Sequence, residues 1–356
     1  MATVFGQDYP RAALEKRIGH ITQIAGVRMM ELCDGVEAGV RIAEVRTGSG
    51  LRFQVSLDRG MDISVAEYKG TPLAWRSPAG DVHPKYYDSR ETGWTRSFAG
   101  GLMTGCGMSH VGAPCVDEGE ELGMHGRLSH IPAHGVRASS EWIGDGCVFR
   151  VEGFVREYAT FKENLLLHRV IEADLGSSVI TLRDVVVNDA DHRLPLMMLY
   201  HINLGWPLVD QGAELLLNAR STEPRDEEAE KELQQARVFS EPVPGYNEQV
   251  FWHELHSDRN GFATALLMNR KLQRGVFVRY RQHELPKFVE WKMMGEKTYV
   301  VGLEPANCLT HGRAKERARK TLQFLNPGDR REFLVQIGVL EGESELKSFV
   351  AEQNLE

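Results

Sequence analysis

Residues 147–155 read CVFRVEGFV, and in this stretch Phe149 and Val151 alternate with Val148, Arg150 and Glu152. Successive side chains of a β-strand point to opposite faces of a sheet, so this alternation predicts a half-buried strand. Six more segments along the chain are similarly rich in Val, Ile, Leu and Phe: Val36–Val45, Leu51–Leu57, Leu165–Ala173, Ser178–Val187, Gly275–Tyr280 and Arg331–Leu340. The pattern predicts an all-β fold class: one large, mostly antiparallel domain, built as a sandwich or a barrel.

Helices are expected only at the periphery. Pro10–Arg17 predicts a short N-terminal helix, and Ser344–Gln353 predicts a closing helix with Leu346, Phe349 and Val350 on one face. Both would dock against the sheets without forming a layer of their own.

A third helix is expected over Glu223–Arg237, where Pro224 stands near the start and Glu227 precedes Lys231 by four residues. Few residues in this segment are apolar, so it is interpreted as a peripheral insertion. The basic stretch Arg313–Lys320 is interpreted as a solvated loop, because isolated charge runs are usually exposed.

The bulk composition limits both location and partners. The chain of 356 residues has a net charge of −8, so it lacks the basic surplus typical of nucleic-acid-binding proteins. No run approaches the ~20 apolar residues that cross a bilayer. The five cysteines form no Cys-x-x-Cys pair, and Met1–Pro10 lacks an apolar signal core. We therefore expect a soluble cytoplasmic protein with reduced thiols that binds neither nucleic acid nor membrane.

Two parts of unequal size are expected. Residues 1–35 are predicted to form an N-terminal extension that packs on the domain, and residues 36–356 a single β-sandwich domain. No internal repeat or low-complexity linker divides the chain. Its length is ample for one large core, and all-β folds often run long as one unit.

The apolar run Tyr299–Leu303 ends in a carboxylate, Glu304, which Pro305 follows. The proline restricts Glu304 to extended backbone and offers no N–H for a further ladder bond. A carboxylate at the end of a buried strand faces a cleft or needs partners, and apolar surroundings would raise its pKa toward general-base values. The alternative is a structural salt bridge with Lys292 or Lys297.

Two histidines stand in contexts that suit a polar site. His201 follows the apolar run Leu196–Tyr200, and its imidazole could donate a proton because its ordinary pKa lies near neutral pH. The alternative is a hydrogen-bonded core histidine. His125 is flanked by Gly123 and Gly126, which permit unusual backbone angles and a close approach of a ligand. The alternative is a loop histidine without a role.

Neither a metal ion nor a cofactor is expected. His130 and His134 are four residues apart, but Pro132 between them disfavours ligation from one helix face. The glycine-dense stretch Phe98–Gly107 lacks the lysine of a phosphate-binding loop, and no Gly-x-Ser-x-Gly nucleophile motif is present.

Three motifs, in their order, resemble those of the galactose mutarotase-like superfamily, the aldose 1-epimerases. They are Gly123–Arg127, then His201 with Asn203-Leu204, then the strand ending in Glu304-Pro305. Three further segments resemble a bacterial branch of aldose-1-epimerase-like proteins whose substrates are largely unassigned: Leu57–Ile63, Phe98–Gly101 and Trp291–Lys292. The resemblance covers roughly residues 36–340.

The resemblance implies a large antiparallel β-sandwich with a long open cleft and few peripheral helices. It implies that Glu304 acts as base and His201 as acid, and that the enzyme interconverts the α and β anomers of a sugar by ring opening. The residues expected to hold the sugar hydroxyls are His125, Arg127, Asn203, Lys292 and Arg59.

Two departures separate this sequence from well-known subfamilies. Arg127 follows His125-Gly126 where galactose mutarotases have a second glycine, and Ala99 stands where hexose-6-phosphate mutarotases have an arginine. Two alternatives stay open: another sugar isomerase or lyase on the same scaffold, and a non-catalytic carbohydrate-binding protein. The partner expected is a small-molecule sugar, with a homodimer left open.

Overall fold

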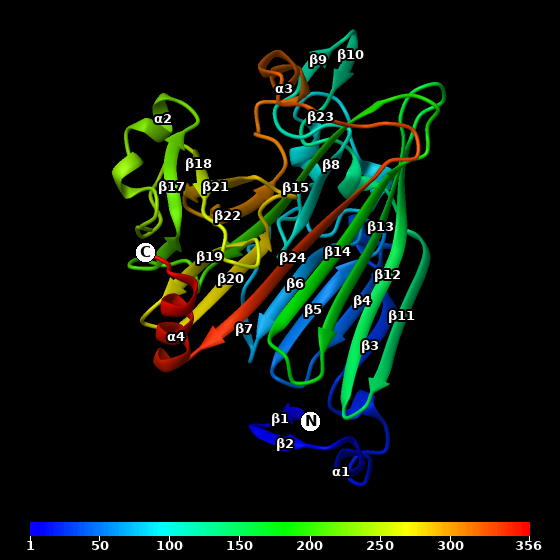
Figure 1. Ribbon diagram of the computed structural model, residues 1–356, viewed down its shortest axis with the longest axis vertical. Coiled ribbons are helices and arrows are strands. Elements are labelled where there is room, and N and C mark those ends of the chain that lie inside the picture. Colours follow the sequence, from blue (N-terminus) through cyan, green and yellow to red (C-terminus); the bar gives the residue numbers. More distant parts are fainter.

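The computed structural model describes residues 1–356 as antiparallel sheets with four α-helices (Figure 1). The largest sheet has the strand order β11 (His134–Ile143), β12 (Gly146–Tyr158), β13 (Asn164–Asp174), β14 (Val179–Asn188), β24 (Arg330–Glu341), β20 (Arg274–Arg281), β19 (Phe262–Asn269) and β16 (Glu214–Leu217). A seven-stranded sheet contains β17 (Ala219–Pro224), β18 (Gln249–Leu255), β21 (Lys287–Met294), β22 (Tyr299–Ala306), β15 (Leu194–Gly205) and β23 (Gln323–Leu325), with β8 (Thr104–Met108) also paired to β15. The predicted all-β class is confirmed.

A five-stranded sheet, two hairpins and the helices complete the chain. The five-stranded sheet runs β3 (Gly26–Glu31), β4 (Arg41–Arg46), β5 (Leu51–Ser56), β6 (Asp62–Tyr68) and β7 (Thr71–Pro72). The hairpins are β1 (Ala2–Val4) with β2 (Gln7–Tyr9), and β9 (Cys115–Asp117) with β10 (Glu120–Leu122). The helices are α1 (Arg11–Glu15), α2 (Glu227–Glu230), α3 (Arg313–Arg319) and α4 (Glu343–Gln353).

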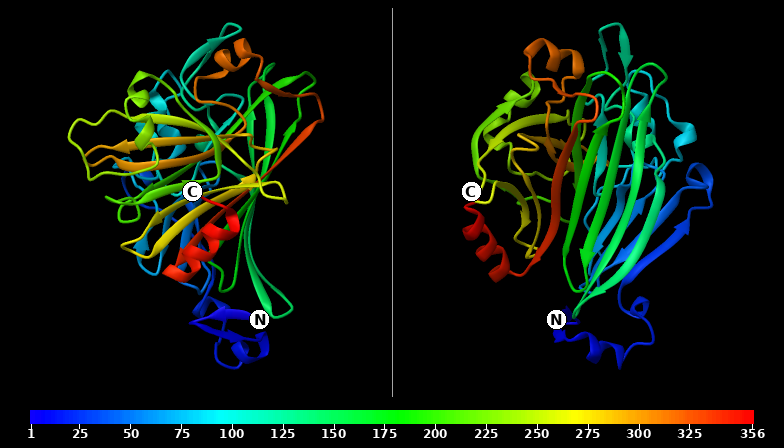
Figure 2. Two further views of the ribbon diagram at one scale, coloured as in Figure 1. Left: turned by 60° about the vertical axis from the view of Figure 1, so that its left-hand side comes forward. Right: turned by 45° about the vertical axis from the view of Figure 1, so that its right-hand side comes forward.

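The sheets form a sandwich around one main core. Strands β11–β14 and β24 form one layer, and strands β3–β6 form a second layer against it. The second layer lies behind the first in Figure 1 and beside it in Figure 2. Bridges Ile63–Met103 and Ala74–Leu204 link the five-stranded to the seven-stranded sheet. One cluster of 64 buried apolar residues draws on all three sheets, and burial of this surface is the main term that favours folding.

Strand β12 shows how the alternating sequence produces the sheet. Phe149 and Val151 are fully buried, whereas Arg150 on the opposite face is partly exposed. Phe149 pairs with Ala173 of β13 and Val151 with Ile171. A shift of one residue in this register would turn the apolar set toward solvent, so burial fixes the pairing.

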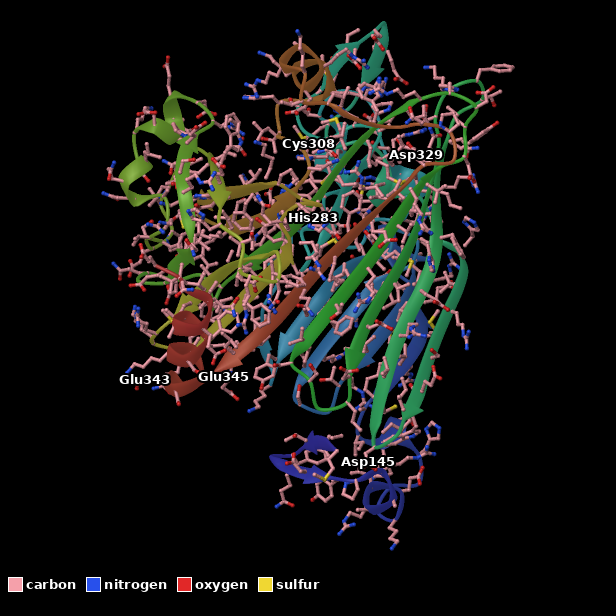
Figure 3. All side chains as sticks on the ribbon, in the orientation of Figure 1. Asp145, His283, Cys308, Asp329, Glu343 and Glu345 are labelled. Carbon is pink, nitrogen blue, oxygen red and sulfur yellow. The ribbon has the colours of Figure 1, made fainter.

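The N-terminal segment belongs to the sandwich at both of its ends. Ala2 is buried in the main core, and the backbone N of Arg11 donates to Asp145 Oδ1 at 3.0 Å, at the turn labelled near the bottom of Figure 3. Strand β3 pairs with β4 along its whole length. The five-stranded sheet therefore begins before residue 36, inside the segment predicted as an extension.

Two of the predictions on local structure are wrong. The helix expected over Glu223–Arg237 is limited to α2 and a separate 3-10 turn at Leu233–Gln235. Ala229 and Ala236 are buried in one small apolar cluster with Phe251 of β18.

The second error concerns Arg313–Lys320, expected as a solvated loop, because residues Arg313–Arg319 form helix α3. Arg313 is only 6% exposed. Its guanidinium donates to Asp117 Oδ2 at 2.7 Å and to Glu120 Oε2 at 2.5 Å, so carboxylates of the β9–β10 hairpin replace the solvent.

Candidate active site

A cavity of about 230 Å³ opens on the seven-stranded sheet. Strands β15, β18, β21 and β22 form its floor, and segments outside these strands form its walls. Its lining residues are Trp94, Thr95, Phe98, Gly112, Ala113, Met124, His125, His201, Arg225, Glu248, Val250, Val289, Trp291, Glu304 and Thr310. The cavity is smaller than the ~300–1,000 Å³ typical of drug-sized ligands, so it suits one small molecule.

Glu304 lies on β22 with its side chain in this cavity and is 2% exposed. It pairs in register with Val289 of β21, which lines the same face. Neither Lys292 nor Lys297 forms an ion pair with it, so the structural salt bridge considered from the sequence is absent. Burial raises the pKa of the Glu304 carboxyl well above its usual range, and the neighbouring Glu248 adds to the effect.

His201 faces Glu304 from the adjacent strand β15. Its Nε2 lies 3.2 Å from Glu304 Oε1, but the alignment is not that of a hydrogen bond, and Oε1 keeps no hydrogen-bond partner. Burial lowers the pKa of His201 to about 4. Both shifts favour the uncharged forms, so burial opposes a charged ion pair between the two side chains.

His125 enters the cavity from a tight turn. Its backbone has φ 57°, in the left-handed region, and Gly126 follows with φ 74°. The His125 ring centroid lies 4.7 Å from that of Trp94 and 5.9 Å from that of His201. Burial lowers the pKa of His125 well below its usual value, so the ring is neutral at pH 7. The structure thus brings Glu304, His201 and His125 together, as the sequence predicted.

Three polar cavity residues were not among the predicted site residues. Arg225 Nη2 lies 3.0 Å from Glu248 Oε1, and Trp291 Nε1 donates to Glu248 Oε2 at 2.9 Å. Arg225 also contacts Asp226 at 2.7 Å. Arg225 and Glu248 stand at the two ends of a long excursion between β17 and β18, and no local motif marks either. Trp291 was noted in the sequence only as part of the Trp291–Lys292 segment that carries the resemblance.

Arg127 and Lys292, expected to hold sugar hydroxyls, do not line this cavity. Arg127 forms ion pairs with Glu157 and Glu163 in a neighbouring depression. Lys292 alternates with Trp291 along β21 and therefore points to the other face of the sheet. There its Nζ donates to the backbone O of Gln235 at 2.9 Å.

Arg59 and Asn203 also lie away from the cavity, and their side chains donate hydrogen bonds to backbone oxygens. Arg59 is 2% exposed and donates to the backbone oxygens of Val82 and Ser97 at 2.7 and 2.8 Å. Asn203 Nδ2 donates to the backbone O of Gly101 at 3.0 Å and of His201 at 2.9 Å. Asn203 thus fixes the backbone that carries His201.

No three His, Cys, Asp or Glu side chains gather in an arrangement that could hold a metal ion. None of the helices is long and apolar enough to span a bilayer. The ionisable groups that line the cavity are Glu304, His201, His125 and the Arg225–Glu248 pair.

The fold is that of aldose 1-epimerases and galactose mutarotase-like proteins. A protein from Klebsiella pneumoniae, described as a "putative aldose 1-epimerase", is 25% identical with a TM-score of 0.88, covering 92% of this chain and 86% of that one. A galactose mutarotase-like protein from Clostridium acetobutylicum is 13% identical with a TM-score of 0.64, covering 90% and 99%. Galactose 1-epimerase from Lactobacillus acidophilus is 14% identical with a TM-score of 0.58, covering 90% and 100%.

The chain belongs to the family described as "Domain of unknown function (DUF4432)", whose model matches residues 37–339. A search of curated proteins found no match.

Proposed function

We propose that this protein is an aldose 1-epimerase that interconverts the α and β anomers of a small sugar. The observation that carries the proposal is the pair Glu304 and His201, 3.2 Å apart and nearly buried in a cavity of small-molecule size. Anomeric exchange needs one group that takes a proton and one that gives it, and a net-neutral pair provides both.

In the proposed reaction, Glu304 removes the proton of the C1 hydroxyl while His201 protonates the ring oxygen. The bond between C1 and the ring oxygen breaks, which gives the open-chain aldehyde. After rotation about the C1–C2 bond, the ring oxygen attacks the other face of C1 and both protons return. In the form that reacts, His201 carries the shared proton and Glu304 is ionised. Transfer of this proton from His201 to Glu304 gives the form in which both side chains are uncharged.

Other cavity residues would bind the sugar. His125 has a polar ring beside the pair, and Arg225 and Glu248 present a donor and an acceptor to hydroxyl groups. Trp94, Phe98 and Trp291 supply aromatic surface for the C–H faces of a sugar. All of these are proposed binding residues, whereas Glu304 and His201 are the proposed catalytic residues.

Anomeric exchange measured by NMR or polarimetry on a panel of neutral, acidic and deoxy sugars tests the proposal. We expect at least one sugar whose exchange the protein accelerates well above the spontaneous rate. Binding of a sugar without acceleration would instead support a carbohydrate-binding protein. Conversion to a product other than the second anomer would support another isomerase or a lyase on this scaffold.

The pH dependence of exchange should reflect the shared proton. Because the pKa of His201 is lowered to about 4, a second proton joins the pair only near that pH. The value of kcat/KM should therefore hold down to about pH 4 and not fall near 6.5, where free imidazole titrates. Because the pKa of Glu304 is raised, loss of the shared proton should occur far above the usual carboxyl range. Initial rates, corrected for spontaneous exchange at each pH, would show this; an acid midpoint between 6 and 7 would contradict it.

Gly302→Ala should lower exchange by about tenfold or more. A Cβ at Gly302 would lie 2.5 Å from Glu304 Oε1 and 3.0 Å from Trp291 Cβ, so the carboxylate must leave its position. Small displacements of a catalytic group have large kinetic effects. Gly146→Ala is the matched control, because its Cβ would meet nothing closer than 3.7 Å. Equal rates for the two variants would show that the carboxylate position is not critical.

A further inference from the structure

A buried carboxylate lies beside the turn that carries His125 but outside the cavity. Glu157 of β12 is 1% exposed. Its Oε2 accepts hydrogen bonds from the backbone N of Met108 at 2.9 Å and of Ser109 at 3.0 Å. Its Oε1 accepts from Ser109 Oγ at 2.8 Å and from Arg127 Nε at 3.5 Å. Four donors compensate for the lost hydration of this charge, and the proposed reaction uses none of them.

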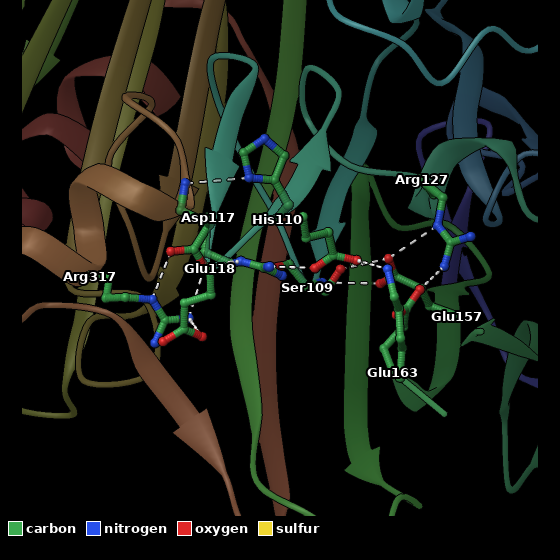
Figure 4. Close-up of polar contacts among 11 residues, drawn as sticks. Ser109, His110, Asp117, Glu118, Arg127, Glu157, Glu163 and Arg317 are labelled. Atoms are coloured by element: carbon green, nitrogen blue, oxygen red, sulfur yellow. Dashed lines mark hydrogen bonds and ion pairs between the residues drawn. The ribbon is translucent and has the colours of Figure 1, made fainter. Parts of the chain in front are cut away.

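Arg127 connects this carboxylate to the His125 turn. Its guanidinium lies between Glu157 and Glu163 (Figure 4). Its backbone N donates to Gly107 O at 3.2 Å, and Gly107 N donates to His125 O at 3.1 Å. The His125 turn is therefore hydrogen-bonded to Gly107, which immediately precedes Met108 and Ser109, whose amides Glu157 binds.

A second charge cluster anchors the other side of the same segment. Arg313 of α3 donates to the backbone O of Ser109 at 3.3 Å and to Asp117 Oδ2 at 2.7 Å. Arg317 also donates to Asp117, at 2.7 and 2.8 Å. Ser109 thus lies between the Asp117 cluster and Glu157 (Figure 4). The segment is held against β12 on one side and against α3 on the other.

His125 needs external support of this kind. Its left-handed backbone, at φ 57°, is unfavourable in a residue other than glycine and persists only where the surroundings impose it. Its Nδ1 is buried without a hydrogen-bond partner, so this nitrogen does not fix the ring. The backbone bonds of the turn, including His125 N to Gly112 O at 2.9 Å, therefore set the ring position.

We propose that Glu157 is a positioning residue that sets the place of the His125 ring in the cavity, acting through Arg127 and the amides of Met108 and Ser109. The proposal rests on the proposed function, in which His125 contacts the sugar. It gives Arg127 a part different from the direct sugar contact suggested by the sequence, because its guanidinium serves two carboxylates outside the cavity.

The test is Glu157→Gln, which keeps the shape of the side chain and removes its charge. Two quantities are measured: the ring ¹⁵N and ¹H resonances of His125 in the free protein, assigned with His125→Asn, and the kcat and KM of exchange. Because His125 is a proposed binding residue, we expect its resonances to shift and KM to rise about tenfold, with kcat changed less than about threefold. Glu44→Gln, which removes the remote carboxylate paired with Arg52 on β4 and β5, is the matched control and should change neither quantity.

Each outcome decides the proposal. Unchanged His125 resonances and an unchanged KM in Glu157→Gln would overturn it, as would equal changes in Glu44→Gln. If the wild type accelerates exchange of no sugar, the proposed function fails, and the His125 resonances still decide whether Glu157 places the ring. If Glu157→Gln does not fold, Ser109→Ala removes one donor to the carboxylate and should give smaller changes in the same two quantities.

Discussion

Glu304→Gln should lower the kcat of anomeric exchange by at least ~10²-fold while sugar affinity changes little. Glutamine keeps the shape of the side chain but cannot accept a proton as a base, and a positioned base contributes typically ~10²–10⁴-fold. His201→Asn should have a similar effect from the acid side. Exchange NMR on the best sugar, with calorimetric affinities, would measure both parts.

The double variant Glu304→Gln/His201→Asn should be little slower than either single variant. The two groups lie 3.2 Å apart and are proposed to act together as base and acid. Removal of either one should therefore disable the proposed pair, and effects within such a unit are not additive. Glu172→Gln, at a carboxylate paired with Arg150 on β12 and β13, is the control and should retain full exchange. Near-wild-type exchange in Glu304→Gln would refute the mechanism even though the fold is right.

Asp184→Ala should reduce the free energy of unfolding by about 3–5 kcal/mol. Asp184 and Arg169 form an ion pair at 2.6 Å with both side chains fully buried, and loss of one partner leaves an uncompensated buried charge. Tyr200 also donates to Asp184 Oδ2 at 2.7 Å, so its hydroxyl would lose its acceptor. Tyr200 precedes His201, which makes this pair part of the support of the proposed site.

Urea unfolding followed by fluorescence and circular dichroism would measure the change. Glu254→Ala is the matched control, because Glu254 and its partner Arg220 are more than half exposed and such pairs contribute ~0–1 kcal/mol. A loss below about 1 kcal/mol in Asp184→Ala would show that water or neighbouring groups compensate for the buried Arg169.

Local patterns were sufficient for the sheets and marked the central residues of the candidate site, whose roles were implied only by the resemblance. The alternation in residues 147–155 predicted β12 because the faces of a strand follow from residue parity alone. Glu304 attracted attention because it follows an apolar run and precedes Pro305, although the ladder does not end there and β22 continues to Ala306. His125 attracted attention because its neighbouring glycines permit a turn with positive φ. These properties depend on covalent geometry within a few residues.

The alternation of side chains along a strand also limits where Lys292 can point. Trp291 and Lys292 are consecutive in a strand, so only one of them can face a given cavity. Which face becomes the site depends on how the sheets pack, and here Val289 and Trp291 line it. The alternation of a strand therefore meant that Trp291 and Lys292 could not both line the cavity. Tertiary packing determined that Trp291 is the one that does.

Local alternation was enough to predict the all-β class, and apolar runs placed Glu304 and His201 on buried strands. Packing of the folded chain determined which charged residues lie beside them. Arg225 and Glu248 meet at the cavity across a long excursion, whereas Arg127, two residues from His125, is drawn to Glu157 and Glu163. The physical reason is that a strand imposes its periodicity locally, but a charged side chain finds its partner wherever the folded chain places an opposite charge.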